Sequence, residues 1–237
     1  MQPFRLALGF LTILPLTPHG EVPGRGWGNA LVAFPVVGAL LSSVTLVVRH
    51  GALLLGLSPA LAAALAVTVS ILLTGGLHLD GLMDAADGLL GGATPEQRLA
   101  IMRDESVGAF GALAGMTVLL LKFAALQSAA PWGIVLASTW SRTVMALAVV
   151  SIPSARPNGL GAWWKKHARP HHAWLAGGLA CALTLVAGLR GAATGLSVAL
   201  FAWGLTRWML RRVPGLTGDL YGALGELVET LALLLWA

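Results

Sequence analysis

Long apolar runs separated by short polar stretches make up most of the chain. A bilayer core about 30 Å thick requires roughly 20 apolar residues, because an α-helix rises about 1.5 Å per residue. Residues 4–17 form a short run broken by prolines, which predicts an interfacial or re-entrant segment. The remaining runs are predicted to span a membrane, and they cover residues 28–48, 52–74, 108–130, 131–152, 173–189, 191–210 and 220–236. The pattern predicts an all-α, polytopic integral membrane protein with about six or seven transmembrane helices, and no linker divides residues 1–237 into separate domains.

The composition agrees with this pattern and excludes several other classes of protein. Hydrophobic residues make up 57% of the chain and charged residues only 11%, and the mean hydropathy is +0.80. A soluble domain carries about 25% charged residues, so an ordinary soluble enzyme and a disordered chain are both excluded. The one cysteine, Cys181, excludes a disulfide-stapled scaffold and is expected to be a small buried apolar residue. The N-terminal run lacks a small-residue cleavage site, so we do not expect a removed signal peptide.

The basic residues lie mainly on one side of the predicted membrane. Alternation of the seven spans places residues 1–27, 75–107, 153–172 and 211–219 on that side, which therefore holds every polar, motif-like segment. Arg49 and Arg190 are the two basic residues at the other side. Because basic loops stay in the cytoplasm, we expect a cytoplasmic-membrane protein whose polar face is cytoplasmic. The net charge of +5 is then explained by topology and lipid headgroups, and no nucleic-acid partner is expected.

Three tryptophans lie in or beside the basic loop of residues 160–172. Trp163, Trp164 and Trp174 are expected to form part of an interfacial aromatic belt. The loop itself is either a headgroup anchor or a substrate-binding loop.

An acidic block in residues 74–92, TGGLHLDGLMDAADGLLGG, carries the strongest chemical signal. Asp80, Asp84 and Asp87 stand at i, i+4 and i+7, which places them on one face of a helix. No lysine or arginine lies within ten residues to neutralise them. Oxygen ligands of this kind favour Mg²⁺ or Mn²⁺, although a solvated acidic helix face is the alternative. His78 is either a residue that supports this site or a hydrogen-bonded interfacial histidine.

The segment that follows predicts a short surface helix. Thr94 is the expected N-cap, Pro95 the first helical residue, and Gln97 completes a capping box. Arg98 and Glu96 are expected to lie in water. Arg103 is a candidate phosphate ligand, because arginine can bind phosphate through two hydrogen bonds, and Asp104 and Glu105 follow it.

Several charged residues fall within the apolar runs themselves. Arg142 lies near the middle of its predicted span, which by default indicates a functional site or an acidic partner. Lys122 is expected either to reach the headgroups or to be paired. The last span carries Glu226 and Glu229, for which Arg142 is a candidate partner, and a purely structural ion pair is the alternative.

Five segments in order resemble one known family. They are GGLHLDGLMDAADGLLGG, IMRDESVGAFGAL, LKFAAL, SRTVMAL and TGDLYGALGEL, and they are similar to the cobalamin synthases, which are adenosylcobinamide-GDP ribazoletransferases. The resemblance implies an integral membrane enzyme that joins adenosylcobinamide-GDP to α-ribazole, or its 5′-phosphate, with release of GMP and with Mg²⁺ as cofactor. Other late cobalamin-assembly enzymes are possible partners. Leu79 stands where several members carry an acidic residue, and Asp104 is a candidate for that role.

The resemblance and the residue chemistry together give a set of expected roles. Asp80, Asp84 and Asp87 are expected to hold the metal, with one aspartate as an alternative base. Phosphates are expected to contact Arg103, Arg142 and Arg156, and the further candidates are His78, Asp104, Asp219 and Glu226. A CDP-alcohol-type phosphotransferase of lipid synthesis and a membrane transporter are the alternative functions.

Overall fold

A computed structural model describes residues 2–16 and 24–237, and the elements in these residues are helices. They are α1 (Gln2–Leu11), α2 (Gly24–Leu54), α3 (Pro59–Thr74), α4 (Leu77–Gly91), α5 (Pro95–Ile101), α6 (Ala109–Ser128), α7 (Pro131–Ser151), α8 (Leu160–His167), α9 (Pro170–Val186), α10 (Gly188–Leu210) and α11 (Gly218–Leu234). The all-α prediction is therefore confirmed. The short helix α1 has 10 residues, too few to cross a bilayer; the end of the predicted segment 4–17 lies outside the described residues.

Among the described helices, fewer have the length and composition of a membrane span than the sequence predicts. Helices α2, α6 and α7 each qualify as a span, and α3 with α4 make a fourth only if the bent pair is counted as one. Helices α9 and α11 coincide with predicted apolar runs but have 17 residues each. The membrane character of the fold is supported, and the expected seven crossings remain a prediction.

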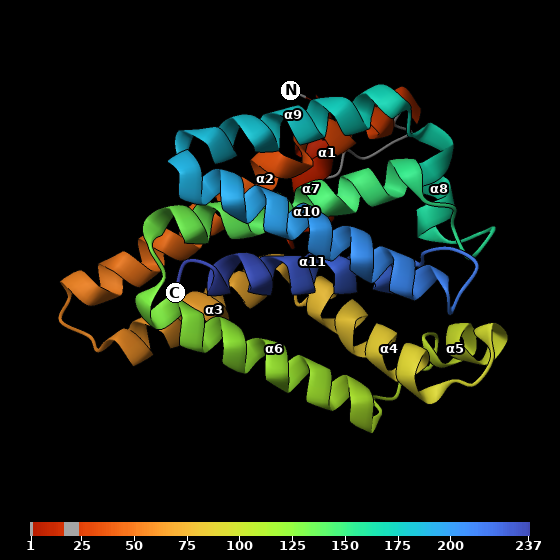
Figure 1. The fold of residues 1–237 in the computed structure, drawn as a ribbon, viewed down its shortest axis with the longest axis horizontal. Helices are drawn as coiled ribbons and strands as arrows, with labels where there is room; N and C mark the ends of the chain where they lie inside the picture. The colour runs from red at the N-terminus through yellow and green to blue at the C-terminus, as the bar shows by residue number, and fades with distance from the viewer. Residues whose placement is uncertain (1, 17–23) are drawn as a thin grey trace.

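The polar segments gather at one end of the helical bundle, as the predicted alternation requires. In Figure 1 the helices α5 and α8 and the connection from α10 to α11 lie at the right-hand end. The connections from α2 to α3 and from α9 to α10, and the C-terminus, lie at the left-hand end. Segments 75–107, 153–172 and 211–219 are thus neighbours in space although they are far apart in the sequence.

Helices α7 and α11 form the centre of the bundle. Helix α7 packs along α2 and α11, and α11 in turn packs along α4. Most side chains of α7 and α11 are buried. Helices α4 and α11 approach each other closely at two glycines, which have no Cβ. A Cβ added to Gly81 would lie 3.1 Å from the Asp219 backbone, and one added to Gly222 would lie 3.1 Å from the His78 carbonyl oxygen. This crossing brings the acidic block against the first turn of α11.

Two consecutive glycines turn the chain between α3 and α4 by 88°. Gly75 and Gly76 have φ angles of 62° and 71°, in the left-handed region that residues with a Cβ avoid. Gly75 also ends α3, since its N–H and that of Gly76 reach the carbonyls of Leu72 and Ile71. After the turn α4 runs alongside α11 and α6 toward α5 (Figure 1), and the predicted helical face of Asp80, Asp84 and Asp87 falls within this one helix.

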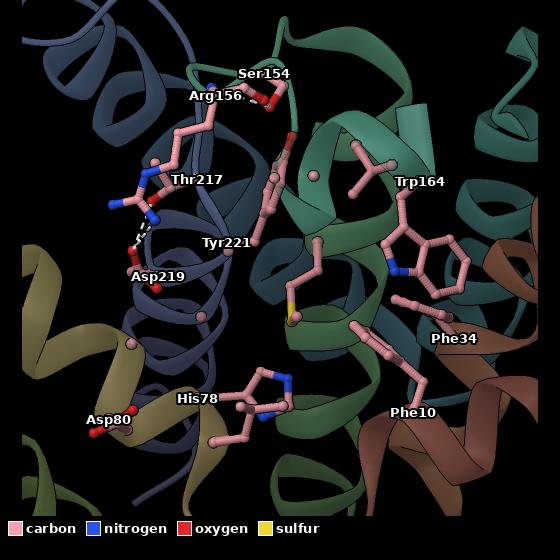
Figure 2. Close-up of a pocket in the computed structure, with 18 residues that line it drawn as sticks. Phe10, Phe34, His78, Asp80, Ser154, Arg156, Trp164, Thr217, Asp219 and Tyr221 are labelled. Carbon is pink, nitrogen blue, oxygen red and sulfur yellow. Dashed lines mark hydrogen bonds and ion pairs between the residues drawn. The ribbon is translucent and has the colours of Figure 1, made fainter. Parts of the chain in front are cut away.

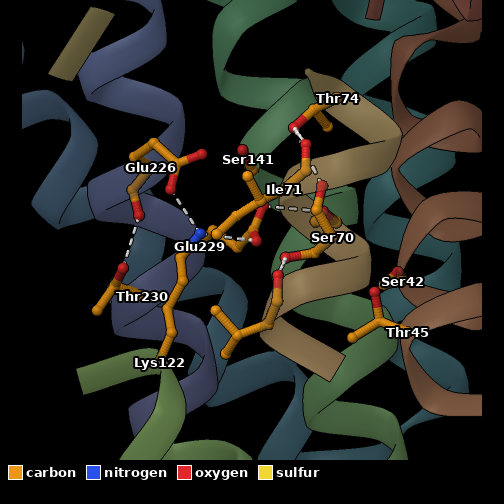
Figure 3. Close-up of polar contacts among 12 residues, drawn as sticks. Ser42, Thr45, Ser70, Ile71, Thr74, Lys122, Ser141, Glu226, Glu229 and Thr230 are labelled. Atoms are coloured by element: carbon orange, nitrogen blue, oxygen red, sulfur yellow. Dashed lines mark hydrogen bonds and ion pairs between the residues drawn. The ribbon is translucent and has the colours of Figure 1, made fainter. Parts of the chain in front are cut away.

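A buried ion cluster decides between the alternatives that the sequence leaves open for the charges within the spans. Lys122 does not reach the headgroups: its Nζ lies 2.5 Å from Glu226 Oε2 and 2.9 Å from Glu229 Oε1, inside the bundle (Figure 3). Ser138 donates a hydrogen bond of 2.8 Å to the other oxygen of Glu229. Lys122, rather than Arg142, is therefore the ion-pair partner of the two glutamates. We call Lys122, Ser138, Glu226 and Glu229 the buried ion cluster.

Three smaller predictions are also corrected. Cys181 is exposed on the surface of the bundle rather than buried, because its side of α9 faces away from the core. Trp164 is buried among aromatic rings, with Phe10 and Phe34 at centroid distances of 4.9 and 5.6 Å, whereas Trp174 is exposed as an interfacial residue would be. Part of the basic loop of residues 160–172 is the helix α8.

Candidate active site

A cavity of about 240 Å³ lies at the polar end of the bundle, where α4, α8 and α11 meet (Figure 2). One part of its wall is aromatic and apolar, and another part carries charged side chains. Its lining residues include Phe10, Phe34, His78, Asp80, Met145, Ser154, Arg156, Trp164, Thr217, Asp219 and Tyr221. Four residues that the sequence singled out, His78, Asp80, Arg156 and Asp219, therefore share one cavity.

Arg156 and Asp219 form the charged part of the wall. Arg156 Nη1 lies 3.5 Å from Asp219 Oδ2, and Thr217 donates a hydrogen bond of 3.1 Å to the same oxygen (Figure 2). The Arg156 side chain is also held by a hydrogen bond of 3.1 Å to the carbonyl of Leu99. Partial burial lowers the pKa of Arg156, and the charge of Asp219 opposes that shift. A guanidinium remains protonated in proteins, so the cavity has a fixed positive charge.

The local backbone explains why these two side chains meet. Thr217 is the N-cap of α11 and accepts a hydrogen bond from the Leu220 N–H, which places Asp219 in the first helical turn. The loop after α7 is tied to the segment before α11 by two backbone hydrogen bonds, from Ala155 N to Leu216 O (3.0 Å) and from Leu216 N to Pro153 O (2.9 Å). Arg156 follows directly after this tie.

The aspartates of α4 are crowded with negative charge. Asp84 is repelled by the charges of Asp80, Asp219 and Asp87, and Arg156 is the cation that offsets them. Asp80 lines the cavity, while Asp84 lies one helical turn further along α4. A bound cation would stabilise this arrangement, because neighbouring like charges raise the free energy of the ionised site.

Asp87 has a different set of contacts from those expected of a metal ligand. Its Oδ2 accepts a hydrogen bond of 2.8 Å from Gly108 N, and its Oδ1 accepts one of 2.8 Å from Gly111 N. These amides belong to the start of α6, where the N–H groups have no partner within the helix. A Cβ on Gly108 or Gly111 would lie 2.4 or 2.2 Å from the carboxylate oxygens. The motif GAFG thus leaves room for Asp87 to cap α6.

The donor chemistry fits magnesium, although the described residues contain no group of three His, Cys, Asp or Glu side chains arranged to hold an ion. Magnesium usually takes one or two carboxylates together with substrate phosphates. Asp80 on the cavity wall and Asp84 one turn further along α4 offer two carboxylates whose charges repel each other. The expectation that Asp87 also binds the metal stays a prediction, and both of its oxygens already accept backbone hydrogen bonds.

Three buried polar groups on the cavity wall find no hydrogen-bond partner among the described residues. They are both ring nitrogens of His78, the indole N–H of Trp164 and the hydroxyl of Tyr221. These three residues expose only 2–5% of their surface. Tyr221 is not among the residues that the sequence predicts for the site, and Trp164 is predicted at the membrane interface. The available signal for Tyr221 is that the only tyrosine of the chain lies within TGDLYGALGEL.

Two other predicted residues, Arg103 and Asp104, do not line the cavity. Arg103 is exposed, and its positive charge acts on Arg156. Asp104 is exposed too, and hydrogen bonds from the Ser106 hydroxyl and amide lower the pKa of its carboxyl. The predicted capping box of α5 is confirmed. Arg98, which was expected to lie in water, donates a hydrogen bond of 3.0 Å to the Arg212 carbonyl and ties α5 to the end of α10.

Arg142 and Glu226 belong to a different part of the molecule. Both line a small cavity within the bundle together with Lys122 and Glu229. Arg142 Nη1 donates a hydrogen bond of 2.9 Å to Ser141, and its side chain is almost completely buried. The structure therefore separates these two candidates from Arg156 and Asp219.

Comparison with known proteins gives matches along nearly the whole chain. The family model described as cobalamin-5-phosphate synthase matches residues 3–237. A protein named adenosylcobinamide-GDP ribazoletransferase from Desulfitobacterium hafniense is 38% identical, covering 99% of this chain and 96% of the relative. Proteins with the same name from Pseudomonas putida (41% identical; 97% and 95% covered) and Synechocystis (38%; 96% and 91%) are also similar. No solved structure matches the chain.

Proposed function

The chain belongs to the cobalamin-5-phosphate synthase family, and we propose that it transfers the phosphocorrinoid group of adenosylcobinamide-GDP to α-ribazole or α-ribazole 5′-phosphate, with release of GMP. Its relatives mark it as a transferase of the nucleotide-loop step in cobalamin assembly. The exact substrates, the Mg²⁺ dependence and a cytoplasmic-face active site in the inner membrane are parts of this proposal. The excess of basic residues in the segments at the polar end supports that orientation.

One observation carries the proposal at the level of the site. Arg156, Asp219 and Asp80 line a single cavity at the polar end of an apolar bundle. Phosphoryl transfer depends chiefly on positioning and on stabilisation of charge at the phosphate oxygens. The guanidinium of Arg156 can stabilise this charge, and together with the carboxylates of Asp80 and Asp219 it can position the substrates.

The reaction requires one bond to form and one to break. A hydroxyl oxygen of the acceptor attacks the phosphorus that carries the corrinoid, and the bond from that phosphorus to the bridging oxygen of GMP breaks. The bonding electrons leave with GMP, and the hydroxyl proton passes to Asp80 or Asp219, the carboxylates on the cavity wall. Arg156 is placed to orient a phosphate and to stabilise its charge.

Magnesium would be held by Asp80 and Asp84 together with substrate phosphates. When bound, it would neutralise the charge that develops on the phosphate oxygens. The proposed ligands rest on the crowding of carboxylates around Asp84.

The two alternative functions are less well supported. A CDP-alcohol-type phosphotransferase shares the use of aspartates beside a diphosphate, but the family match extends over residues 3–237 and points to cobalamin assembly. A transporter would place its charged residues along a path through the membrane. Here Lys122 is paired with both Glu226 and Glu229 in the buried ion cluster.

A GMP-release assay tests the proposal. Purified protein in detergent, given Mg²⁺, adenosylcobinamide-GDP and α-ribazole, is expected to release GMP and form a corrinoid with a nucleotide loop. Arg156→Gln is expected to lower kcat/KM by at least about 100-fold, in line with the loss of a charged group that stabilises the transition state. Lys166→Gln, which changes an exposed cation of α8, is the matched control and should retain activity. Substrate flux into liposomes without any product would overturn the transferase.

A further inference from the structure

The cavity is small compared with the donor of the proposed reaction. Its volume of about 240 Å³ is below the roughly 300–1,000 Å³ of pockets that enclose drug-sized ligands. Adenosylcobinamide-GDP combines a corrin macrocycle, an adenosyl group and a guanosine diphosphate. Such a molecule must lie mostly outside the cavity, whereas a single nucleoside is of a suitable size.

The apolar part of the wall suits a flat aromatic ring. Phe10, Phe34 and Trp164 contact one another there, with Trp164 set edge-on to both phenylalanines at interplanar angles of 63° and 77°. Met145 also lines the cavity, and Tyr221 lies between Trp164 and the Arg156–Asp219 pair in Figure 2. Aromatic faces and edges pack well against planar heterocycles, and the adjoining charged part offers Arg156 and Asp219 to a polar group.

Unpaired polar atoms distinguish this cavity from a packing defect. His78, Trp164 and Tyr221 are each more than nine-tenths buried, and within the described part of the chain their ring nitrogens, indole N–H and hydroxyl have no partner. Buried polar groups in native proteins are almost always hydrogen-bonded. Three such groups around one cavity, drawn together in Figure 2, indicate a ligand that carries its own donors and acceptors.

We infer that this cavity is the acceptor pocket and that it binds a nucleoside with a flat N-heterocycle, while the corrinoid donor stays outside. The heterocycle lies against Phe10, Phe34 and Trp164. The ribose extends toward Tyr221, and its attacking hydroxyl reaches the Arg156–Asp219 pair. This inference rests on the proposed function, because it assigns one of the two proposed substrates to the cavity.

Two conservative substitutions test the assignment. Trp164→Phe removes the indole N–H but keeps an aromatic ring, and Tyr221→Phe removes only the hydroxyl. Each is expected to raise the KM for α-ribazole by about 3- to 10-fold, the effect of one lost hydrogen bond, and to leave the KM for adenosylcobinamide-GDP unchanged. Trp163→Phe, a change at an exposed neighbour of Trp164 that does not line the cavity, is the matched control.

A binding measurement separates failure of the inference from failure of the proposed function. α-Ribazole alone is expected to quench tryptophan fluorescence of the wild type, and to quench Trp164→Phe less than Trp163→Phe. An increase in the KM for the donor, or no change in either KM, would overturn the acceptor pocket while the transferase stands. Binding and quenching by α-ribazole without any GMP release by the wild type would contradict the proposed reaction and leave the pocket assignment in place. Circular dichroism of each variant confirms that it is folded.

Discussion

The three aspartates of α4 have three different surroundings, although they lie on one helix. Asp80 lines the cavity, Asp84 is surrounded by other carboxylates, and Asp87 accepts hydrogen bonds from the start of α6. The spacing of four and three residues brings all three to one side of the helix, but the neighbours come from α6, α11 and the loop after α7. An aspartate is therefore expected to have a different role at each of these three positions.

Asp84→Asn is expected to abolish GMP release without loss of stability. The substitution removes a charge that Asp80, Asp219 and Asp87 repel, so the free energy of unfolding should stay the same or rise slightly. It also removes one proposed magnesium ligand. Thermal unfolding in detergent and the GMP-release assay measure the two effects. Unchanged turnover would contradict the role proposed for Asp84.

Asp87→Asn is expected to lower stability, because an amide cannot accept hydrogen bonds at both of its terminal atoms. One of the bonds from Gly108 N and Gly111 N is lost at a helix N-terminus. We expect a decrease of about 1–2 kcal/mol in the free energy of unfolding. Denaturant titration of the purified variant measures it, with Glu96→Gln, an exposed acid of α5, as the control. A variant as stable as the wild type would show that Asp87 does not cap α6.

At the scale of the elements, the apolar pattern predicts most helices and misses how they turn. The runs 28–48, 108–130 and 131–152 correspond closely to α2, α6 and α7, because length and hydropathy are properties of one segment. The run 52–74 includes the turn between α2 and α3, where Gly56 has a φ of 80°. The right angle between α3 and α4 depends on the φ angles of Gly75 and Gly76, which hydropathy does not report.

The sequence predicts only part of the site, because some of its features are properties of one segment and others depend on how the helices pack. His78, Asp80, Arg156 and Asp219 are polar residues in apolar or glycine-rich surroundings, so the sequence marks them. Trp164 resembles an interfacial residue, and its burial against Phe10 and Phe34 depends on how α1, α2 and α8 pack together. The partner of Glu226 and Glu229 also comes from another helix, α6. Pairings between distant helices require tertiary contacts that one sequence does not supply.

Gly76→Ala is expected to lower the free energy of unfolding by about 1–2 kcal/mol, since a Cβ is disfavoured at a φ of 71°. Space does not limit the substitution: the nearest atom to the added Cβ is 3.9 Å away. Gly51→Ala is the matched control, because Gly51 lies within α2 and its added Cβ would meet nothing within 4 Å. The control should gain up to about 1 kcal/mol. Equal stability of the two variants would contradict the strain argument.

At the scale of the whole molecule, the buried ion cluster connects three helices. Lys122 comes from α6, Ser138 from α7, and Glu226 and Glu229 from α11. The cluster joins α6 to the central pair of helices (Figure 3). Removal of one partner alone leaves buried charges uncompensated, which is more costly than removal of a positive and a negative partner together.

Lys122→Met is expected to destabilise the protein by about 3–5 kcal/mol. The double variant Lys122→Met, Glu226→Gln should recover a large part of that loss, because it leaves one negative charge, that of Glu229, with the positive charge of Arg142, which lines the same small cavity. Thermal unfolding of the two variants in the same detergent measures the difference. If the double variant were less stable than Lys122→Met, the ion pairs themselves would not be the cause of the effect.

The double glycine between α3 and α4 also has a consequence during synthesis. Helix α11, against which α4 packs, is translated more than a hundred residues after α4 ends, a delay of roughly 5–25 s at ordinary elongation rates. Until then the aspartates of α4 have no partner from α11, and Arg156 itself is translated more than sixty residues after α4 ends. Because Gly75 and Gly76 turn the backbone locally, the right angle between α3 and α4 can form before α11 is made. The turn thus sets the direction of α4 ahead of the helix that completes the site.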